Sequence, residues 1–388
     1  MRWMQAAALL LAAVAGLAQS APFTPASDSE VVERLPAGTD PAVRAVESRR
    51  RQLAARPADM ALRLEIGQRY FDLAMAQGDP RYVGYASAAI APMEAAAPAD
   101  ARFWLLRGLL QQYGHQFEEA LRSLRRASAL DPRAAEPVAW RAAILMVQAR
   151  YAEAARECEQ LRALAAPLQA LGCAAYVQAS TGQLGDAYQG LTAALKAAEA
   201  VPPGLALWLR TRLAEMAVRL QRWDEAEAHY RAALALDVTD QFLLGSRADF
   251  LLLRGRPAEV LRLLAGWERS DILLLRLALA GQAVGDRRAA DWQRQLRDRF
   301  LAAAQRGDRL HEQEAARWAL ELEHDPARAL DFAQANYQRQ KEARDAEMLL
   351  RAALAARQPA AAQPALEWLR SSRYEDPVLQ QLAAQVTR

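Results

Sequence analysis

The chain has 388 residues, of which 53% are hydrophobic and 24% are charged, and its formal net charge is +3. This hydrophobic content excludes an intrinsically disordered chain. Positive and negative side chains alternate along the predicted helices, as in Asp286, Arg287, Arg288 and Asp291, whereas nucleic-acid binding requires a concentrated basic stripe. We therefore expect a folded protein that does not bind nucleic acid.

The first twenty residues resemble a secretory signal peptide. Arg2 supplies a positive charge, residues 6–18 are apolar, and Ala18 and Ser20 are the small residues that cleavage requires. The apolar stretch is shorter than an ordinary membrane-spanning helix, and no cysteine follows it to accept a lipid. We expect residues 1–20 to be cleaved, which leaves a periplasmic protein without a membrane span. An uncleaved anchor and release from the cell are the alternatives.

A flexible leader and a first helical region follow the signal peptide. Residues 21–39 contain three prolines and two of the chain's serines, a composition typical of a flexible segment. Asp40 can cap a first helix that has Pro41 at its first position. Residues 60–76 and 81–97 then form a degenerate helix pair. Residues 40–100 are thus predicted to be N-terminal helices with one degenerate repeat.

The most complete unit of the chain is a helix-turn-helix over residues 101–132. Its characteristic residues are Trp104, Gly108, Phe117, Ala120, Leu124, Ala127, Leu130, Asp131 and Pro132. Two antiparallel helices approach closely only where they carry small side chains, so we expect Gly108 to face Ala120. The residue expected at this helix crossing recurs about once per unit, as Ala120, Ala154, Ala187, Ala226, Val260, Ala290 and Ala329. An internally repeated fold follows.

This pattern resembles the tetratricopeptide repeat family, whose unit of about 34 residues has a W, L-G, Y, A, F and P signature. The resemblance implies an all-α, right-handed superhelical solenoid of antiparallel helix pairs, with about eight repeats and degenerate ends. Recognisable repeats cover residues 101–270. Degenerate repeats and a capping helix that begins at Asp376-Pro377 cover residues 271–388. Terminal repeats of solenoids are often atypical because one of their faces meets water.

Members of this family generally bind other polypeptides in a groove formed by their first helices. The positions that usually line the groove correspond here to Arg102, Leu109, Gln112, Tyr113, Met146, Tyr176, Trp208, Glu215, Arg219 and Asp249. The set is aromatic, apolar and lightly charged, which favours an extended peptide or a helix as the ligand. The lysines and asparagines with which chaperone adaptors of this family clamp a terminal carboxylate are missing.

The two cysteines, Cys158 and Cys173, lie in adjacent repeats. Cys158 belongs to the second helix of one unit and Cys173 to the first helix of the next, so the two side chains can face each other across a repeat junction. In an oxidising compartment we expect a disulfide, with two buried thiols as the alternative. Their spacing is unlike the Cys-x-x-Cys of redox motifs.

Signals for catalysis are lacking in the sequence. The four histidines are scattered over different repeats, and neither a zinc-binding pair, a phosphate-binding loop nor a nucleophile motif is present. The adjacent carboxylates Glu118 and Glu119 diverge on a helix and make poor acid–base partners. We therefore predict no catalytic, cofactor-binding or metal-binding residue and no enzymatic activity. A hydrolase with an unrecognised site is the least favoured hypothesis.

Two functions remain. The first is a non-catalytic scaffold of the bacterial envelope that holds a polypeptide partner in its groove, in the assembly of an envelope complex. The alternative is an accessory subunit that binds a polysaccharide or small ligand, with Tyr113, Tyr176 and Trp208 stacked on sugar rings.

Overall fold

The computed structural model describes residue 27 and residues 40–95, 99–307 and 310–387. The chain divides into two compact units, residues 1–45 and 46–388. Of the first unit, the described residues are Ser27 and residues 40–45, which include the start of the first helix. The predicted signal peptide, residues 1–20, and most of the predicted leader lie outside the described residues.

The described residues form twenty α-helices and no strand. The helices are α2 (Pro41–Ala55), α3 (Met60–Gln77), α4 (Arg81–Glu94), α5 (Ala101–Tyr113), α6 (Phe117–Leu130), α7 (Glu136–Val147), α8 (Tyr151–Leu164), α9 (Pro167–Ala179), α10 (Leu184–Ala197), α11 (Pro203–Arg219), α12 (Trp223–Leu234), α13 (Gln241–Leu253), α14 (Pro257–Leu263), α15 (Asp271–Val284), α16 (Ala289–Gln305), α17 (Glu312–Glu321), α18 (Pro326–Tyr337), α19 (Ala343–Ala355), α20 (Gln363–Ser372) and α21 (Pro377–Val386), with a 3-10 helix at Pro359–Ala362. In the described part of the chain, no helix is both long and apolar enough to span a bilayer.

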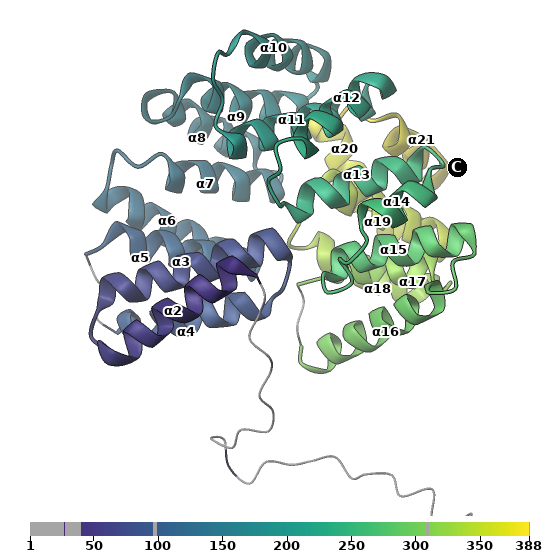
Figure 1. Cartoon of the computed structure of the whole chain (residues 1–388). Helices are drawn as coiled ribbons and strands as arrows, with labels where there is room; N and C mark the ends of the chain where they lie inside the picture. The colour runs from purple at the N-terminus through teal and green to yellow at the C-terminus, as the bar shows by residue number, and fades with distance from the viewer. Residues whose placement is uncertain (1–26, 28–39, 96–98, 308–309, 388) are drawn as a thin grey trace, which may run out of the picture. The chain divides into compact units, whose positions relative to one another are not determined.

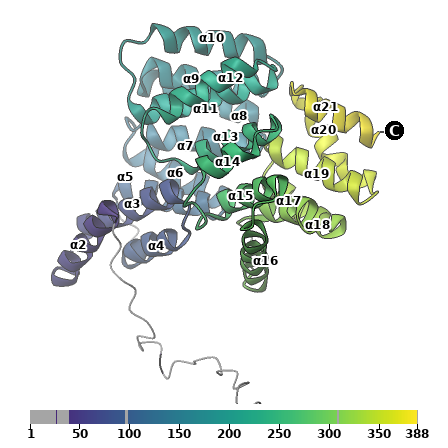
Figure 2. The same ribbon diagram turned by 45° about the vertical axis from the view of Figure 1, so that its right-hand side comes forward.

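The helices from α3 to α18 pack as consecutive pairs, and α19 packs against α18, α20, α21 and the 3-10 helix. Figures 1 and 2 show successive pairs stacked side by side along the chain. The predicted all-α array of helix pairs is therefore confirmed.

Several helices begin directly after a residue whose side chain caps them. Helix α2 starts at Pro41, and the carboxylate of Asp40 accepts a hydrogen bond from the Ala42 amide at 2.7 Å. In the same way, helix α21 starts directly after Asp376, whose carboxylate accepts from the Val378 amide at 2.9 Å. Such caps satisfy amides that have no partner within the helix.

Small residues allow the two helices of a pair to approach closely. A Cβ atom on Gly108 would lie 2.8 Å from Cγ of Leu124 and 3.4 Å from the carbonyl oxygen of Ala120. The crossing residue is the fourth residue of the second helix and is buried in six pairs, as Ala120, Ala154, Ala187, Ala226, Val260 and Ala329. The close approach of each pair is thus built into the sequence.

The predicted crossing residue is wrong in the pair formed by α15 and α16. Ala290 is exposed, whereas Ala289 and Trp292 are buried. A Cβ atom on Gly281 would lie 3.2 Å from Cβ of Ala289 and 2.9 Å from the ring of Trp292. Because α16 begins at Ala289, its fourth residue is Trp292, and the first helix accommodates this large ring with a glycine.

Buried apolar side chains join neighbouring pairs. One cluster runs from Phe117 to Val177, a second from Ala175 to Phe250, and a third from Leu244 in α13 to Val386 in α21. Each cluster contains residues of successive pairs, so each pair is stabilised by the pairs beside it.

Candidate functional site

Two of the predicted groove residues belong to the core. The side chains of Leu109 and Met146 expose 1% and 6% of their surface. Both lie on faces of α5 and α7 that pack against neighbouring helices, and burial of aliphatic side chains there stabilises the stack. A ligand does not reach these two residues, so their assignment to a groove is corrected.

Three other predicted residues lie along α5. Arg102 is exposed at the start of this helix, where its guanidinium pairs with Asp100 at 2.7 Å. Gln112 and Tyr113 are half-buried near its end. The amide oxygen of Gln112 is buried and has no hydrogen-bond partner among the described residues.

The ring of Trp208 packs against α9. A Cβ atom on Gly172 would lie 2.7 Å from this ring, so the glycine leaves the space that the indole occupies. Trp208 is half-buried and belongs to the periphery of an apolar cluster. Its contact with Gly172 accounts for its position without a sugar ligand.

Tyr176 lies in a cluster that joins three helix pairs. The guanidinium of Arg212, on α11, lies between the rings of Tyr176 and Phe242, at 4.7 Å and 4.5 Å from their centroids. Tyr176 comes from α9 and Phe242 from α13. Stacking of a guanidinium between two aromatic rings is a favourable electrostatic contact.

Charged residues of α11 and of the start of α19 complete this cluster. Glu215 pairs with Arg212 at 2.9 Å and accepts a hydrogen bond from the Ser246 hydroxyl at 3.2 Å. Arg344 pairs with Glu342 at 2.7 Å and lies 5.8 Å from the centroid of the Phe242 ring. We refer to Tyr176, Arg212, Glu215, Phe242, Glu342 and Arg344 as the central cluster.

Burial changes the ionisation of the central cluster. Burial raises the pKa of Tyr176 to about 12. Burial also raises the pKa of Glu215, and the charge of Arg212 offsets only part of the rise. For Glu342 burial acts in the same direction, but Arg344 and Arg212 together outweigh it and lower the pKa. Two guanidinium groups thus alternate with two carboxyl groups of unequal acidity.

Asp249, another predicted groove residue, joins a chain of ion pairs. It pairs with Arg276 at 2.5 Å and with Arg317 at 2.7 Å. Burial raises the pKa of Asp249, but the two guanidinium groups outweigh it and lower the pKa to about 2. The chain continues from Arg317 to Glu321 at 3.2 Å and from Glu321 to Arg351 at 2.7 Å. This chain of ion pairs therefore links α13, α15, α17 and α19.

Arg219 lies at the end of α11 and contacts the loop between α20 and α21. Its guanidinium donates hydrogen bonds to the carbonyl oxygens of Ala179 at 2.5 Å and Glu375 at 2.9 Å. It also stacks on the ring of Tyr374, at 3.8 Å from the centroid. Residues of the same chain therefore occupy the side of Arg219 that was expected to face a ligand.

Sequence analysis missed the arginines near the middle of the first helices. Arg141, Arg247 and Arg276 are buried, and each pairs with a carboxylate on a neighbouring helix. Comparable arginines are Arg107 in α5, Arg212 in α11 and Arg317 in α17. Arg107, Arg141 and Arg247 each lie 13 residues before the crossing residue of their pair, and this recurrence was the available signal. In α11 the spacing of Trp208, Arg212 and Glu215 also places Arg212 on the predicted face.

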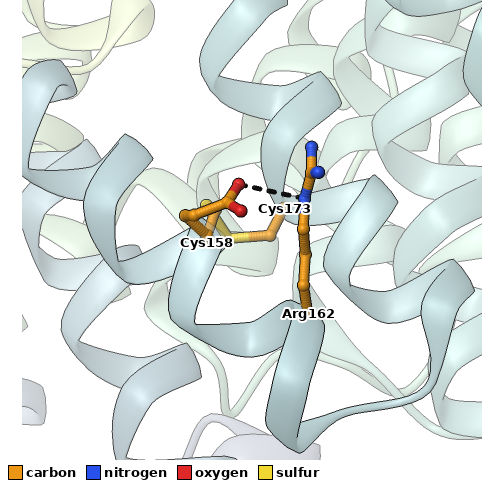
Figure 3. Close-up of a disulfide and its surroundings, with 4 residues drawn as sticks. Cys158, Arg162 and Cys173 are labelled. Atoms are coloured by element: carbon orange, nitrogen blue, oxygen red, sulfur yellow. Dashed lines mark ion pairs between the residues drawn. A yellow bond between two sulfur atoms is a disulfide. The ribbon is translucent and has the colours of Figure 1, made fainter.

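The two cysteines form a disulfide between adjacent repeats (Figure 3). Cys158 is on α8 and Cys173 is on α9, with Cα atoms 5.5 Å apart, within the range that a disulfide spans. An ion pair between Glu159 and Arg162 lies beside the bridge (Figure 3). In the described part of the chain, no group of three or more histidine, cysteine, aspartate or glutamate side chains is placed to hold a metal ion.

No protein-family model and no curated protein matches the chain. Among solved structures, it is similar to the hetero-tetramer Cut9–Hcn1 of APC/C, with 11% identity, a TM-score of 0.39 and coverage of 89% of this chain and 53% of that chain. The chain thus spans about half the length of that relative.

Two further solved structures match nearly their whole length. A tetratricopeptide repeat protein from Parabacteroides merdae ATCC 43184 has 14% identity and a TM-score of 0.32, with 89% of this chain and 99% of that chain covered. The TPR domain of P58(IPK) has 15% identity and a TM-score of 0.26, with 85% and 98% covered. In its fold of stacked helix pairs, the chain is similar to tetratricopeptide repeat proteins.

Proposed function

We propose that this protein is a non-catalytic scaffold of the bacterial periplasm that holds a polypeptide partner against the central cluster, in the assembly of an envelope complex. The observation that carries the proposal is the convergence of aromatic and charged side chains from α9, α11, α13 and α19 on one place. Such convergence of separate repeats is how a solenoid builds a binding surface.

The chemistry of the central cluster favours a polypeptide ligand. Arg344 exposes 43% of its side chain, so its remaining donors are accessible. Two guanidinium and two carboxyl groups offer both donors and acceptors with no net charge, which suits the alternating N–H and C=O groups of a peptide main chain. Tyr176 and Phe242 add apolar surface for side chains of the partner.

Site-specific photo-crosslinking in cells tests the scaffold proposal. A photoreactive amino acid at Tyr176 should capture a discrete polypeptide. The matched control places the same amino acid at Leu171, an exposed residue of the same helix. Equal capture from both positions, or none from Tyr176, would refute the assignment of the partner to the central cluster.

The periplasmic location is part of the proposal and has its own test. The predicted signal peptide and the disulfide between Cys158 and Cys173 both support an oxidising compartment. The mature protein should be recovered from the periplasm with Ala21 as its first residue. Recovery with an intact N-terminus from the cytoplasm would contradict it.

A further inference from the structure

A set of long-range contacts, which we name the seam, joins turns of the first repeats to the C-terminal helices. On one side lie His115, Val147, Tyr151, Leu184 and Arg219, and on the other lie Gln340, Lys341, Trp368, Tyr374 and Glu375. The partners are far apart in the sequence, by 225 residues for His115 and Gln340.

The loop before α19 makes the first half of the seam. The Lys341 amide donates a hydrogen bond to the carbonyl oxygen of Val147 at 2.7 Å. The side-chain amide of Gln340 contacts the imidazole of His115, with 2.8 Å between its nitrogen and Nε2. The first contact joins two backbone groups, and the second joins the ends of two side chains.

Helix α20 and the loop after it make the second half. The indole N–H of Trp368 donates to the Tyr151 hydroxyl at 2.9 Å. The carboxylate of Glu375 accepts from the Leu184 amide at 2.6 Å and so caps α10 from outside its own repeat. Arg219 adds its hydrogen bond to the carbonyl oxygen of Glu375.

Apolar packing across the seam is sparse. Among the described residues that precede α11, those that pack against the C-terminal core cluster are Ala149 and Tyr151, both half-buried. A pocket of about 310 Å³ lies in the seam, between residues 149–153 and the side of α20 that carries Trp368 and Ser372. The interfaces between neighbouring pairs, in contrast, bury whole rows of leucine and alanine.

The seam divides the central cluster. Tyr176, Arg212 and Glu215 belong to α9 and α11, whereas Glu342 and Arg344 directly follow the loop that contacts Val147. Separating the seam therefore moves Glu342 and Arg344 away from Tyr176, Arg212 and Glu215.

We infer that the seam is a releasable closure, in which the C-terminal helices cover the ligand-facing residues of α9 and α11 until a polypeptide partner enters between the two halves of the central cluster. The inference rests on the proposed function. A contact made of separate polar bonds beside a pocket opens at lower free energy than a packed core, so local opening precedes unfolding.

Hydrogen exchange tests the opening of the seam without a partner. In the double variant Glu375→Ala/Trp368→Phe, the amide of Lys341 should exchange at least about tenfold faster than in the wild type, because two hydrogen bonds of the seam are lost and each is worth about fivefold. Glu367→Ala, at an exposed position of α20, is the control and should leave the rate unchanged. An unchanged Lys341 rate in the double variant would overturn the inference.

A covalent lock tests the link to binding. A Cβ atom on Gly182 would lie 3.1 Å from Cβ of Arg373, close to the roughly 3.5–4.5 Å of disulfide-bonded residues. Gly182→Cys/Arg373→Cys, once oxidised, should lower photo-crosslinking at Tyr176 at least about tenfold, since ten times fewer molecules would be open. Gly182→Ser/Arg373→Ser carries the same backbone strain at residue 182 without the lock and is the matched control.

The outcomes separate the two proposals. Equal crosslinking in the locked variant and its serine control overturns the closure and leaves the scaffold intact. If neither variant nor the wild type is crosslinked, the scaffold proposal is refuted. The exchange rate of the Lys341 amide then still decides whether the seam opens.

Discussion

Arg247 on α13 and Glu227 on α12 form an ion pair between adjacent repeats, joined by two hydrogen bonds. Their side chains expose only 6% and 19% of their surface. Arg256 also pairs with Glu227, at 2.7 Å. The hydrogen bond from Arg247, joined by that from Arg256, lowers the pKa of Glu227 to about 2. A half-buried carboxylate is thus kept ionised by two guanidinium groups.

Replacement of this carboxylate should make the protein less stable in a pH-dependent way. Because the folded-state pKa of Glu227 is lowered, its stabilisation is complete above about pH 4.5 and is lost as the pH falls towards 2. Glu227→Gln should therefore reduce the free energy of unfolding by about 1–2 kcal/mol at pH 7, since solvent screens part of the interaction. Urea unfolding at pH 7 and at pH 2 measures this loss of stability. Asp224→Asn, at an exposed position of the same helix, is the control. An equal loss at pH 7 and at pH 2 would contradict this explanation.

The crossing of α5 and α6 should not tolerate a side chain at Gly108. A Cβ atom there would lie 2.8 Å from Cγ of Leu124, which is not the free end of a side chain. Gly108→Val should cost about 2 kcal/mol or more by overpacking. Thermal unfolding of the variant and the wild type measures this loss of stability. Gly190→Ala, where no atom lies within 4 Å, should instead be neutral or stabilising, and a similar loss in both variants would speak against close packing.

The disulfide should contribute to stability by closing a loop. Cys158 and Cys173 are separated by 15 residues. Constraint of such a loop in the unfolded chain is worth about 3 kcal/mol, so Cys158→Ser/Cys173→Ser should be less stable by about that amount. Unfolding with and without reductant checks the value. The double variant should not respond to reductant; a response there would mean that reductant acts elsewhere.

His115 should make stability depend on pH between its two pKa values. Burial, followed by the charges of His311 and Arg339, lowers the pKa of folded His115 to about 4. The unfolded chain binds a proton to this residue below about pH 6.5. Stability should therefore be complete above that pH and should decline as the pH falls to about 4.

The test compares the free energy of unfolding at pH 7.5 and pH 5. His115→Gln should flatten the dependence, since it removes one group that takes up a proton on unfolding. His324→Gln, at an exposed position, should retain the wild-type slope. A wild-type slope in His115→Gln would show that the buried imidazole is not responsible.

Local features of the sequence determine the helices and their pairing. Pro41 and Asp376 mark helix starts, and Asp131-Pro132 directly follows the end of α6. Small residues recur at the crossings because two antiparallel helices approach closely only where at least one of them carries a small side chain. These constraints act within one repeat, so the helices and their pairing can be predicted from the sequence.

Only the tertiary structure decided which residues are available to a ligand. The register of α16, which places Trp292 rather than Ala290 at the crossing, depends on how its turn packs. Burial of Met146 depends on the pairs on either side of its own, and the contact of Arg219 with Tyr374 depends on the successive rotations of many repeats. Those rotations are small for each pair but add up along the chain. They bring together residues that are far apart in the sequence, and no local sequence pattern predicts their contact.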